Sequence, residues 1–347
     1  MVSRVLPLGQ PPIIGYNYLS FPLSIMTNHE EYLPWFYSNY IQLCCSADFL
    51  EQGTMNFDFY NYDFTVHPLP WLDIQRISRE LIFASYSDIK KFLMDSLDRG
   101  CYIYLFLDEF HLSHKTMHLS KHFYHDNFIY GYNDKEKMFN TVGFDKTRLF
   151  TNTLMPFSEL DASFNGVEMI KDELNYIHLF RFNSNGQYDF DINLVIGLLQ
   201  DFLQARNTSE HFSLFKNPNK QAYGMDVYRC IIEYFENLTA GNITCDVRPF
   251  HILWEHKKCM MAKLIYMENR YQSNDLQLIR QSYEEIEKAS LVIRNVIIKY
   301  YATRNEKLIL NNIEAIHKLM NRERELFSQL VDLLELVAQA PHSVERR

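Results

Sequence analysis

The sequence predicts an α+β protein in which a mixed domain of residues 1–185 precedes a helical domain of residues 190–347. Proline residues break the first half into short elements, whereas apolar residues recur with a period of 3.6 after the loop-like segment 182–191. Aromatic residues make up 15% of the chain, and nearly all are Phe or Tyr, which favour half-buried sheet surfaces. A chain of 347 residues is also long enough for about two domains.

The first well-marked elements of the mixed domain are a helix and a strand. A helix is expected at 87–100, because Ser87 can cap its start, apolar side chains recur at helical spacing and Gly100 stands where it would end. The apolar run 101–110 follows at once and predicts a buried strand.

An antiparallel sheet is expected around that strand. Two apolar runs, 127–132 and 138–144, are joined by a short polar connection, which is typical of a β-hairpin. The alternating segment 176–182 predicts one more strand at the end of the domain.

The second domain is predicted to consist of amphipathic helices throughout. Its last two apolar-periodic runs are long enough to pack against each other as an antiparallel pair. The predicted helical segments are 192–204, 222–238, 251–271, 277–303 and 305–339.

Composition and motifs exclude several classes of protein. The net charge is −9 and no long run of Lys or Arg occurs, so nucleic acid is not an expected partner. No window reaches ~18 uninterrupted apolar residues and the opening segment does not resemble a signal peptide, so we expect a cytoplasmic protein without membrane contact. The six cysteines lack C-x-x-C spacing and are expected to remain thiols. Motifs of nucleotide-binding loops, dinucleotide folds, serine hydrolases and zinc proteases are absent.

Five histidines fall within fifteen positions, and their spacing of three, four, four and three would align them on one face of a helix. Five rings in a line cannot converge on one metal ion, since a helical zinc site uses two ligands at i and i+4 with a third from elsewhere. We therefore expect surface or loop histidines and no metal or other cofactor, with a metal protein as the least favoured alternative. The five are His111, His114, His118, His122 and His125.

Two carboxylates, Asp108 and Glu109, follow the predicted strand 101–110. Neighbouring residues on a strand point to opposite faces, so the two are not expected to act as a pair. Their simplest role is to solvate the end of the strand, and one of them is placed to orient the histidine-rich segment. His125 differs from the other histidines because it stands where this segment enters an apolar strand, a rigid place for a catalytic base.

The segment HDNFIYGYNDKEKMFNTVGF resembles the His-containing hairpin of papain-like and bacteriocin-processing-peptidase-like proteins, in which H-x-x-x-x-x-G-Y-D/N opens one strand. Together with YIYLFLDEF and the helical second half, it is similar to the butirosin biosynthesis protein H family. The resemblance implies a papain-like fold for residues 1–185 with an antiparallel sheet. It also implies acyl transfer from a carrier-protein thioester to an amine rather than proteolysis.

In this family, an acid near the end of the return strand orients the histidine. The residues at that place are Asn140 and, just beyond the strand, Asp145, and neither matches cleanly. The fold places the nucleophile at the start of an early helix, where the helix dipole lowers the pKa of a thiol. The early thiols are Cys44 and Cys45.

The segment around these cysteines allows two structures. If a strand ends at Cys45 and Ser46 caps a short helix that stops at Gly53, Cys45 lies at the positive end of that helix and would be an active thiolate. If instead a helix starts at Pro34 and runs through Cys45, both thiols lie at its negative end, where ionisation is opposed. The chain would then be a catalytically altered relative.

Two functions follow from the resemblance. The first is an acyltransferase or amide-forming enzyme of natural-product biosynthesis, such as nonribosomal peptide synthesis, with His125 as general base and Cys45, or else Cys44 or Ser38, as nucleophile. The second is a non-catalytic protein that keeps the fold and binds another pathway protein through its helical half.

The partners implied by the first function are an acyl or peptidyl carrier protein and an amine acceptor. Because the chain is acidic overall, attraction of an acidic carrier would need a local basic patch. Lys257, Lys258 and Lys263 are the residues expected to form it.

Overall fold

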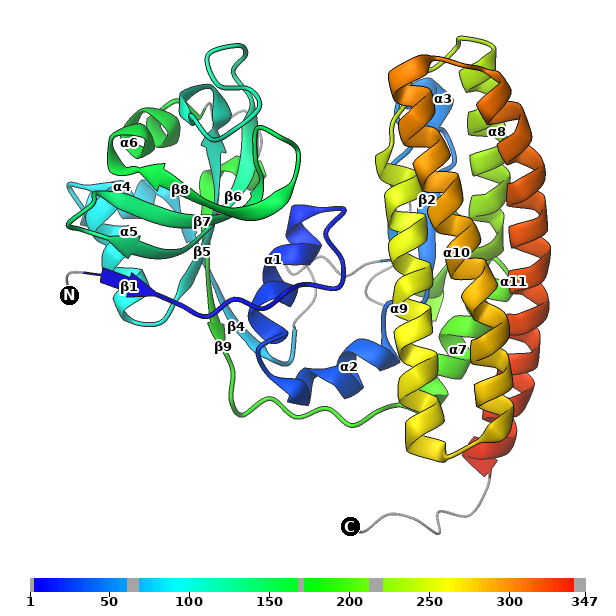
Figure 1. The fold of residues 1–347 in the computed structure, drawn as a ribbon. Helices are drawn as coiled ribbons and strands as arrows, with labels where there is room; N and C mark the ends of the chain where they lie inside the picture. The colour runs from blue at the N-terminus through cyan, green and yellow to red at the C-terminus, as the bar shows by residue number, and fades with distance from the viewer. Residues whose placement is uncertain (1–2, 61–68, 168–171, 212–220, 340–347) are drawn as a thin grey trace. The chain divides into compact units, whose positions relative to one another are not determined.

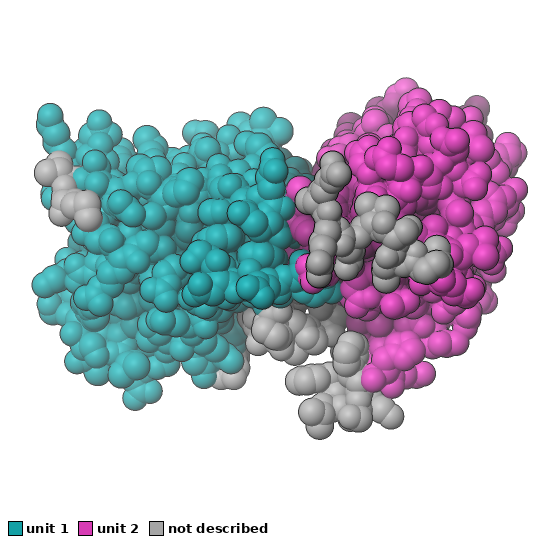
Figure 2. Space-filling view, turned by 90° about the horizontal axis from the view of Figure 1, so that it is seen from below, with its two compact units in different colours: residues 1–32, 63–188 teal, residues 33–62, 189–347 magenta. Residues whose placement is uncertain are grey.

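The computed structural model describes residues 3–60, 69–167, 172–211 and 221–339. The chain forms two compact units, shown in two colours in Figure 2. Unit 1 contains residues 1–32 and 63–188, and unit 2 contains residues 33–62 and 189–347. The chain passes finally from unit 1 to unit 2 after Tyr188, which lies within the predicted interval 185–190. Residues 33–62, which the sequence assigned to the first domain, instead belong to the second unit.

Unit 1 is built on a seven-stranded antiparallel sheet with the order β4-β9-β5-β6-β7-β8, and β1 pairs with the end of β6. The register places His125 of β6 opposite Leu107 of β5, and Asn140 of β7 opposite Gly131 of β6. The strands are β1 Ser3–Val5, β4 Leu72–Ser78, β5 Tyr102–Asp108, β6 Tyr124–Asn133, β7 Met138–Phe144, β8 Phe150–Pro156 and β9 Tyr176–Phe182.

Helices cover both faces of this sheet, with α1 on one face and α4, α5 and α6 on the other (Figure 1). On the α1 face, Phe21 stacks on Phe128 of β6 with ring centroids 4.8 Å apart. The opposite face is held to α5 by the hydroxyl of Tyr132, which donates to Asp98. The helices are α1 Asn17–Met26, α4 Arg79–Ser85, α5 Ile89–Asp98 and α6 Phe157–Asn165.

Unit 2 is mainly helical, and Figure 1 shows its two longest helices, α10 and α11, side by side and joined by a short turn. Its helices are α2 Leu33–Ser38, α3 Phe49–Gln52, α7 Ile192–Leu203, α8 Val227–Thr239, α9 Arg248–Tyr271, α10 Asn274–Thr303 and α11 Lys307–Gln339. A small antiparallel sheet has the order β10-β2-β3, with β2 Leu43–Ser46, β3 Phe57–Phe59 and β10 Gln221–Tyr223.

Buried polar contacts explain why residues 33–62 belong with the helices. The ring of His256 in α9 contacts the carbonyl of Ile41 through Nε2 at 2.6 Å. Lys263, about two turns further along α9 and also buried, donates to the carbonyl of Asn39. Each contact satisfies a buried side chain with a backbone group of the early segment, and leaving such groups unpaired would be costly.

The predicted class, a mixed chain with antiparallel sheets and a helical C-terminal part, is confirmed. The predicted helix 87–100 is α5, and its N-cap is Asp88, which accepts from the amide of Lys90, rather than Ser87. Among the described residues, no helix combines the length and the apolar character that a membrane span requires.

Candidate functional site

His125 lies at the start of β6, where its ring meets two carboxylates. Its Nδ1 is 2.9 Å from Oδ1 of Asp126 and 3.6 Å from Oε1 of Glu109. The ring of Phe123 stacks on the imidazole, and 39% of the His125 side chain remains exposed. We refer to His125, Asp126, Glu109, Lys115 and Asn17 as the His125 cluster.

Asp126 is the buried anchor of this cluster. Its carboxylate accepts a hydrogen bond from Nδ2 of Asn17 at 2.8 Å and one from the hydroxyl of Tyr104 at 3.3 Å. Burial alone would raise the pKa of Asp126, but the contacts with His125 and Asn17 outweigh burial and lower it. Asp126 therefore contacts His125 on one side and the first residue of α1 on the other.

The ion pair shifts His125 in the complementary direction. Burial by itself lowers the pKa of His125, but the interaction with Asp126 and the charge of Glu109 reverse this effect and raise it. Lys115 extends the cluster, because its ammonium is 3.8 Å from Glu109 and donates to the carbonyl of Phe144. Burial raises the pKa of Glu109 and lowers that of Lys115, and their mutual attraction opposes both shifts.

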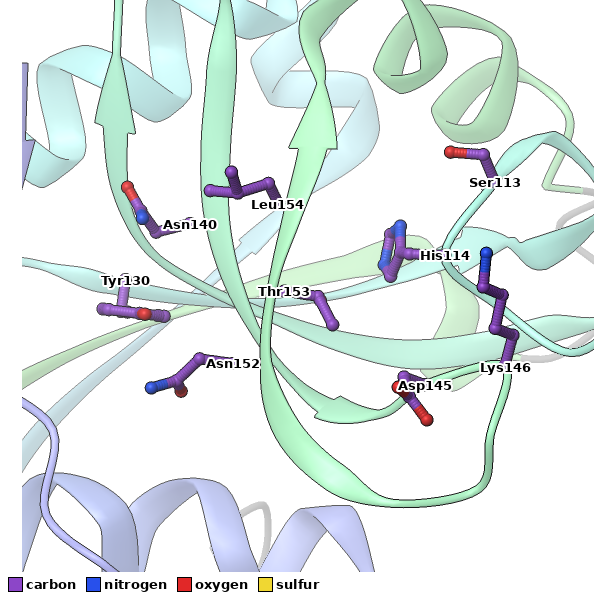
Figure 3. A pocket seen from close by; sticks show the side chains of 9 residues that line it. All are labelled: Ser113, His114, Tyr130, Asn140, Asp145, Lys146, Asn152, Thr153 and Leu154. Atoms are coloured by element: carbon purple, nitrogen blue, oxygen red, sulfur yellow. The ribbon is translucent and has the colours of Figure 1, made fainter.

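Asn140 and Asp145, the two residues predicted to orient His125, line a different feature. They belong to a pocket of about 440 Å³ over β6, β7 and β8, drawn in Figure 3. Asp145 also caps its own turn, accepting from the amides of Thr147 and Leu149. The prediction is therefore corrected: the groups that orient His125 are Asp126 and Glu109. The pocket is lined by Ser113, His114, Tyr130, Asn140, Asp145, Lys146, Asn152, Thr153 and Leu154.

His114 gives this pocket a neutral imidazole. Burial, followed by the charge of Lys115, lowers the pKa of His114 to about 4. Figure 3 shows its ring together with Lys146 and Asp145 at one end of the pocket, with Asn140 at the other. The pocket thus offers one basic and one acidic side chain, a neutral ring and amide groups, which suit the binding of a polar group.

The histidine-rich segment is not the long helix that its spacing suggested. It begins with one 3-10 turn, Glu109–His111, and continues through turns to β6. Its histidines consequently separate: His125 joins the carboxylates, His114 enters the pocket, and His111 and His122 lie beside Asp108. Asp108 and Glu109 are both buried, so the prediction that they solvate the strand end is wrong. Asp108 lies beside His111 and His122, whereas Glu109 lies beside His125 and Lys115. The two carboxylates therefore point to different groups, as expected for neighbouring residues at a strand end.

Cys44 and Cys45 belong to unit 2, whereas His125 belongs to unit 1. Both cysteines lie in β2, which is paired with β10 on one side and β3 on the other. Burial raises the pKa of Cys44 to about 12. The pKa of Cys45 is raised by its hydrogen bond with Cys230 and then by burial. Both shifts oppose the thiolate that nucleophilic attack requires.

Each of the two structures considered for this segment is correct in part. Helix α2 includes Pro34 near its start but ends at Ser38, and β2 then contains both cysteines. A short helix does stop at Gly53, which has a φ of 74°, but its N-cap is Asp48, so Cys45 is not at its start. Ser38 is fully buried, donates to the carbonyl of Pro34 and accepts from the amide of Asp191, which is a structural role.

The predicted basic patch does not form. Lys257 and Lys263 are both buried, and of the three lysines only Lys258 is exposed. Lys257 pairs with Glu323 at 2.8 Å inside the helical unit. The charges of Lys257 and Lys263 are therefore enclosed, and Lys258 alone does not form a basic surface for a carrier protein.

Sequence reasoning missed Asp126, Asn17 and the role of Glu109. The available signal for Asp126 was its position directly after His125, whereas the family resemblance pointed to an acid on the return strand. A comparison with protein-family models finds no match, and a comparison with curated proteins finds none either.

Proposed function

We propose that the chain is a catalytically altered papain-like protein that serves as a non-catalytic binding partner in a natural-product pathway. One observation carries this proposal: the groups that face His125 are the carboxylates of Asp126 and Glu109, and the nearby helix α1 begins with the amide side chain of Asn17. A nucleophile activated by His125 would need a thiol or hydroxyl at this place. An imidazole whose pKa is raised by two neighbouring acids instead supports a fixed, structural charge cluster.

The thiols expected to act as nucleophiles support the same conclusion. Cys45 has no exposed surface and Cys44 is 7% exposed, and both are bonded into the centre of a three-stranded sheet. A reactive cysteine is typically part-exposed and has a lowered pKa, whereas these two have raised values. The expected acid–base orienters, Asn140 and Asp145, face the pocket of Figure 3.

Binding is supported by that pocket. Lys146 and Asp145 offer opposite charges at its rim, while Asn140, Asn152 and Thr153 offer neutral donors and acceptors. Such a lining fits a polar segment of a pathway partner, for example the amide-containing arm of an acyl carrier protein.

The test is cysteine labelling with iodoacetamide at about pH 6, followed by peptide mapping. We expect Cys44 and Cys45 to label more slowly than Cys101 and Cys245, which are part-exposed and serve as internal references. Labelling in denaturant, where all six cysteines are accessible, gives the complete reaction for comparison.

Rapid labelling of Cys44 or Cys45 in the native protein would contradict the proposal and support the cysteine-dependent acyltransferase.

Acyl transfer without a protein nucleophile is the second candidate, favoured by the part-exposed His125 and its buried Asp126. In that mechanism, the neutral form of His125 removes a proton from the attacking amine as the nitrogen adds to the thioester carbon. His125 then returns this proton to the sulfur as the carbon–sulfur bond breaks and the thiol leaves. Turnover of an acyl thioester with an amine that is lost in His125→Ala would establish it.

A further inference from the structure

The histidine-rich segment closes on one carboxylate at its base. Oδ1 of Asp108, at the end of β5, accepts hydrogen bonds from the amides of Phe110 and Phe123, each at 3.1 Å. A second bond, from the amide of Glu109 to the carbonyl of Phe123, holds the same two chain segments together. The two ends of the segment are therefore brought to one point.

This closure brings His111 and His122, which are eleven residues apart, to the other oxygen of Asp108. Nδ1 of His122 is 2.6 Å from Oδ2, and Nε2 of His111 is 3.8 Å from it. One nitrogen from each ring and one carboxylate oxygen all lie within 4.8 Å of one another. We propose that Asp108, His111 and His122 form a binding site for a divalent first-row transition metal ion such as Zn²⁺.

The donor set suits such an ion. Zinc takes imidazole nitrogens and carboxylate oxygens at about 2.0–2.2 Å, so tetrahedral ligand atoms stand roughly 3.3 Å apart. Binding would bring Nε2 of His111 closer to Oδ2 of Asp108 by ~0.5 Å and widen the contact between His122 and Asp108 by ~0.7 Å. Side-chain rotation of part-exposed rings can supply shifts of this size, and His111 and His122 are 30% and 61% exposed.

Two neighbouring residues shape the surroundings of these ligands. Phe110 stacks on the ring of His122 with centroids 4.4 Å apart, which limits its rotation. Gly166 lies against the proposed metal site, and a side chain at this position would come within 3.1 Å of Oδ2 of Asp108 and 3.4 Å of the His111 ring. Because three protein ligands leave one tetrahedral position, water would complete an open site rather than a closed structural one.

The test uses the full chain purified without a nickel column and freed of metal with a chelator. Zn²⁺ is titrated against a chromophoric competitor, and Co²⁺ is titrated while its visible absorption is recorded. We expect one equivalent of metal to bind with a tetrahedral Co²⁺ spectrum. His111→Ala and His122→Ala should each weaken binding at least ~100-fold, because loss of a supporting group alone costs 10–100-fold.

His118→Ala is the matched control, since it removes a histidine of the same segment that is outside the proposed metal site. This variant should bind the metal like the wild type. Asp108→Asn is a second variant, which keeps an oxygen for the two backbone amides and removes the charge, and it should also lose binding. Circular dichroism establishes that each variant is folded. Unchanged affinity in His111→Ala and His122→Ala, or no binding tighter than about 1 mM in the wild type, would overturn the proposal.

Discussion

At the scale of the residue, Asp126 and Glu109 determine the charge of His125. Both acids are buried, and a buried carboxylate is stable only with a cation or several donors beside it. His125 supplies the cation for Asp126, and Lys115 supplies one for Glu109. The cluster therefore contains two acids and two bases, and removing one base leaves an acid without its charge partner.

This pairing predicts a pH-dependent contribution to stability. The pKa of His125 is raised above its usual 6.5, so its stabilising contribution is complete below that pH and is lost as the pH rises through the folded value. The pKa of Asp126 is lowered below 3.8, so its contribution is complete above that pH and is lost on further acidification. Both contributions are present together between about pH 4 and 6.5.

We therefore expect His125→Ala to lower the free energy of unfolding more at pH 5.5 than at pH 8.5. Solvent around the part-exposed ring should keep the difference between the two pH values below about 1 kcal/mol. Denaturant unfolding of both proteins at each pH measures it. His118→Ala, from the same segment, is the matched control. An equal cost at the two pH values for His125→Ala would show that the ion pair does not stabilise the fold.

Local sequence predicted the position of His125 but not its partners. The change from a polar segment to an apolar strand identifies a rigid site for a side chain, and His125 occupies it. Asp126 was overlooked because adjacent strand residues normally diverge, and Asn17 because no local pattern links it to a residue 109 positions away. The raised pKa values of Cys44 and Cys45 also depend on distant residues, because Cys45 is hydrogen-bonded to Cys230 and β10, which pairs with their strand, begins at Gln221.

At the scale of the element, the helices of unit 2 meet at a buried charge. Glu323 of α11 binds Lys257 of α9 and accepts hydrogen bonds from Tyr228 of α8 and Tyr283 of α10. Four helices thus share one carboxylate. Burial lowers the pKa of Lys257, and the charge and hydrogen bond of Glu323 oppose that shift. Such a pair contributes less to net stability than to fixing which helix faces meet, but its disruption is costly.

Lys257→Met should therefore destabilise the protein by about 3–5 kcal/mol, because Glu323 would remain buried without its cation. Lys258→Met is the matched control at the next position, where the exposed ammonium lies over the ring of Trp254 and its loss should cost less than about 1 kcal/mol. Thermal or denaturant unfolding of the two variants measures the difference. Equal costs would show that the buried pair is dispensable.

Element prediction succeeded where the pattern is long or local. The strand 176–182 matches β9, and the runs 277–303 and 305–339 correspond to α10 and α11 within three residues at each end. The short strands β2, β3 and β10 were not predicted as a sheet. Each has three or four residues, too few for a periodic signal, and β10 pairs with a strand about 175 residues earlier.

At the scale of the whole molecule, unit 2 is assembled from two parts of the chain separated by most of unit 1. The early part supplies the carbonyls of Asn39 and Ile41 to buried side chains of α9, and the hydroxyl of Ser38 to the start of α7. The late part alone would leave the side chains of His256 and Lys263 and the amide of Asp191 without these acceptors. Unit 2 therefore requires residues 33–62 for its stability.

A fragment of residues 189–347 should consequently fail to show cooperative unfolding, since the buried Lys263 and His256 would lack their backbone partners. Addition of a peptide of residues 33–62 should restore a cooperative transition, followed by circular dichroism. The same peptide with Ile41→Pro, whose ring disrupts the local backbone, serves as the control and should not restore it. Cooperative unfolding of the fragment alone would contradict this dependence.

The contact between Ile41 and His256 also constrains how the protein is made, because 215 residues separate its two ends. At about 5–20 residues per second, a ribosome needs roughly 10–40 s to supply the second partner after the first has appeared. During that interval Trp35, Phe36 and Phe49, which are buried in the finished protein, lack the later helices α7, α8 and α9 against which they pack. The nascent chain should therefore depend on chaperones that shield apolar segments until synthesis nears its end.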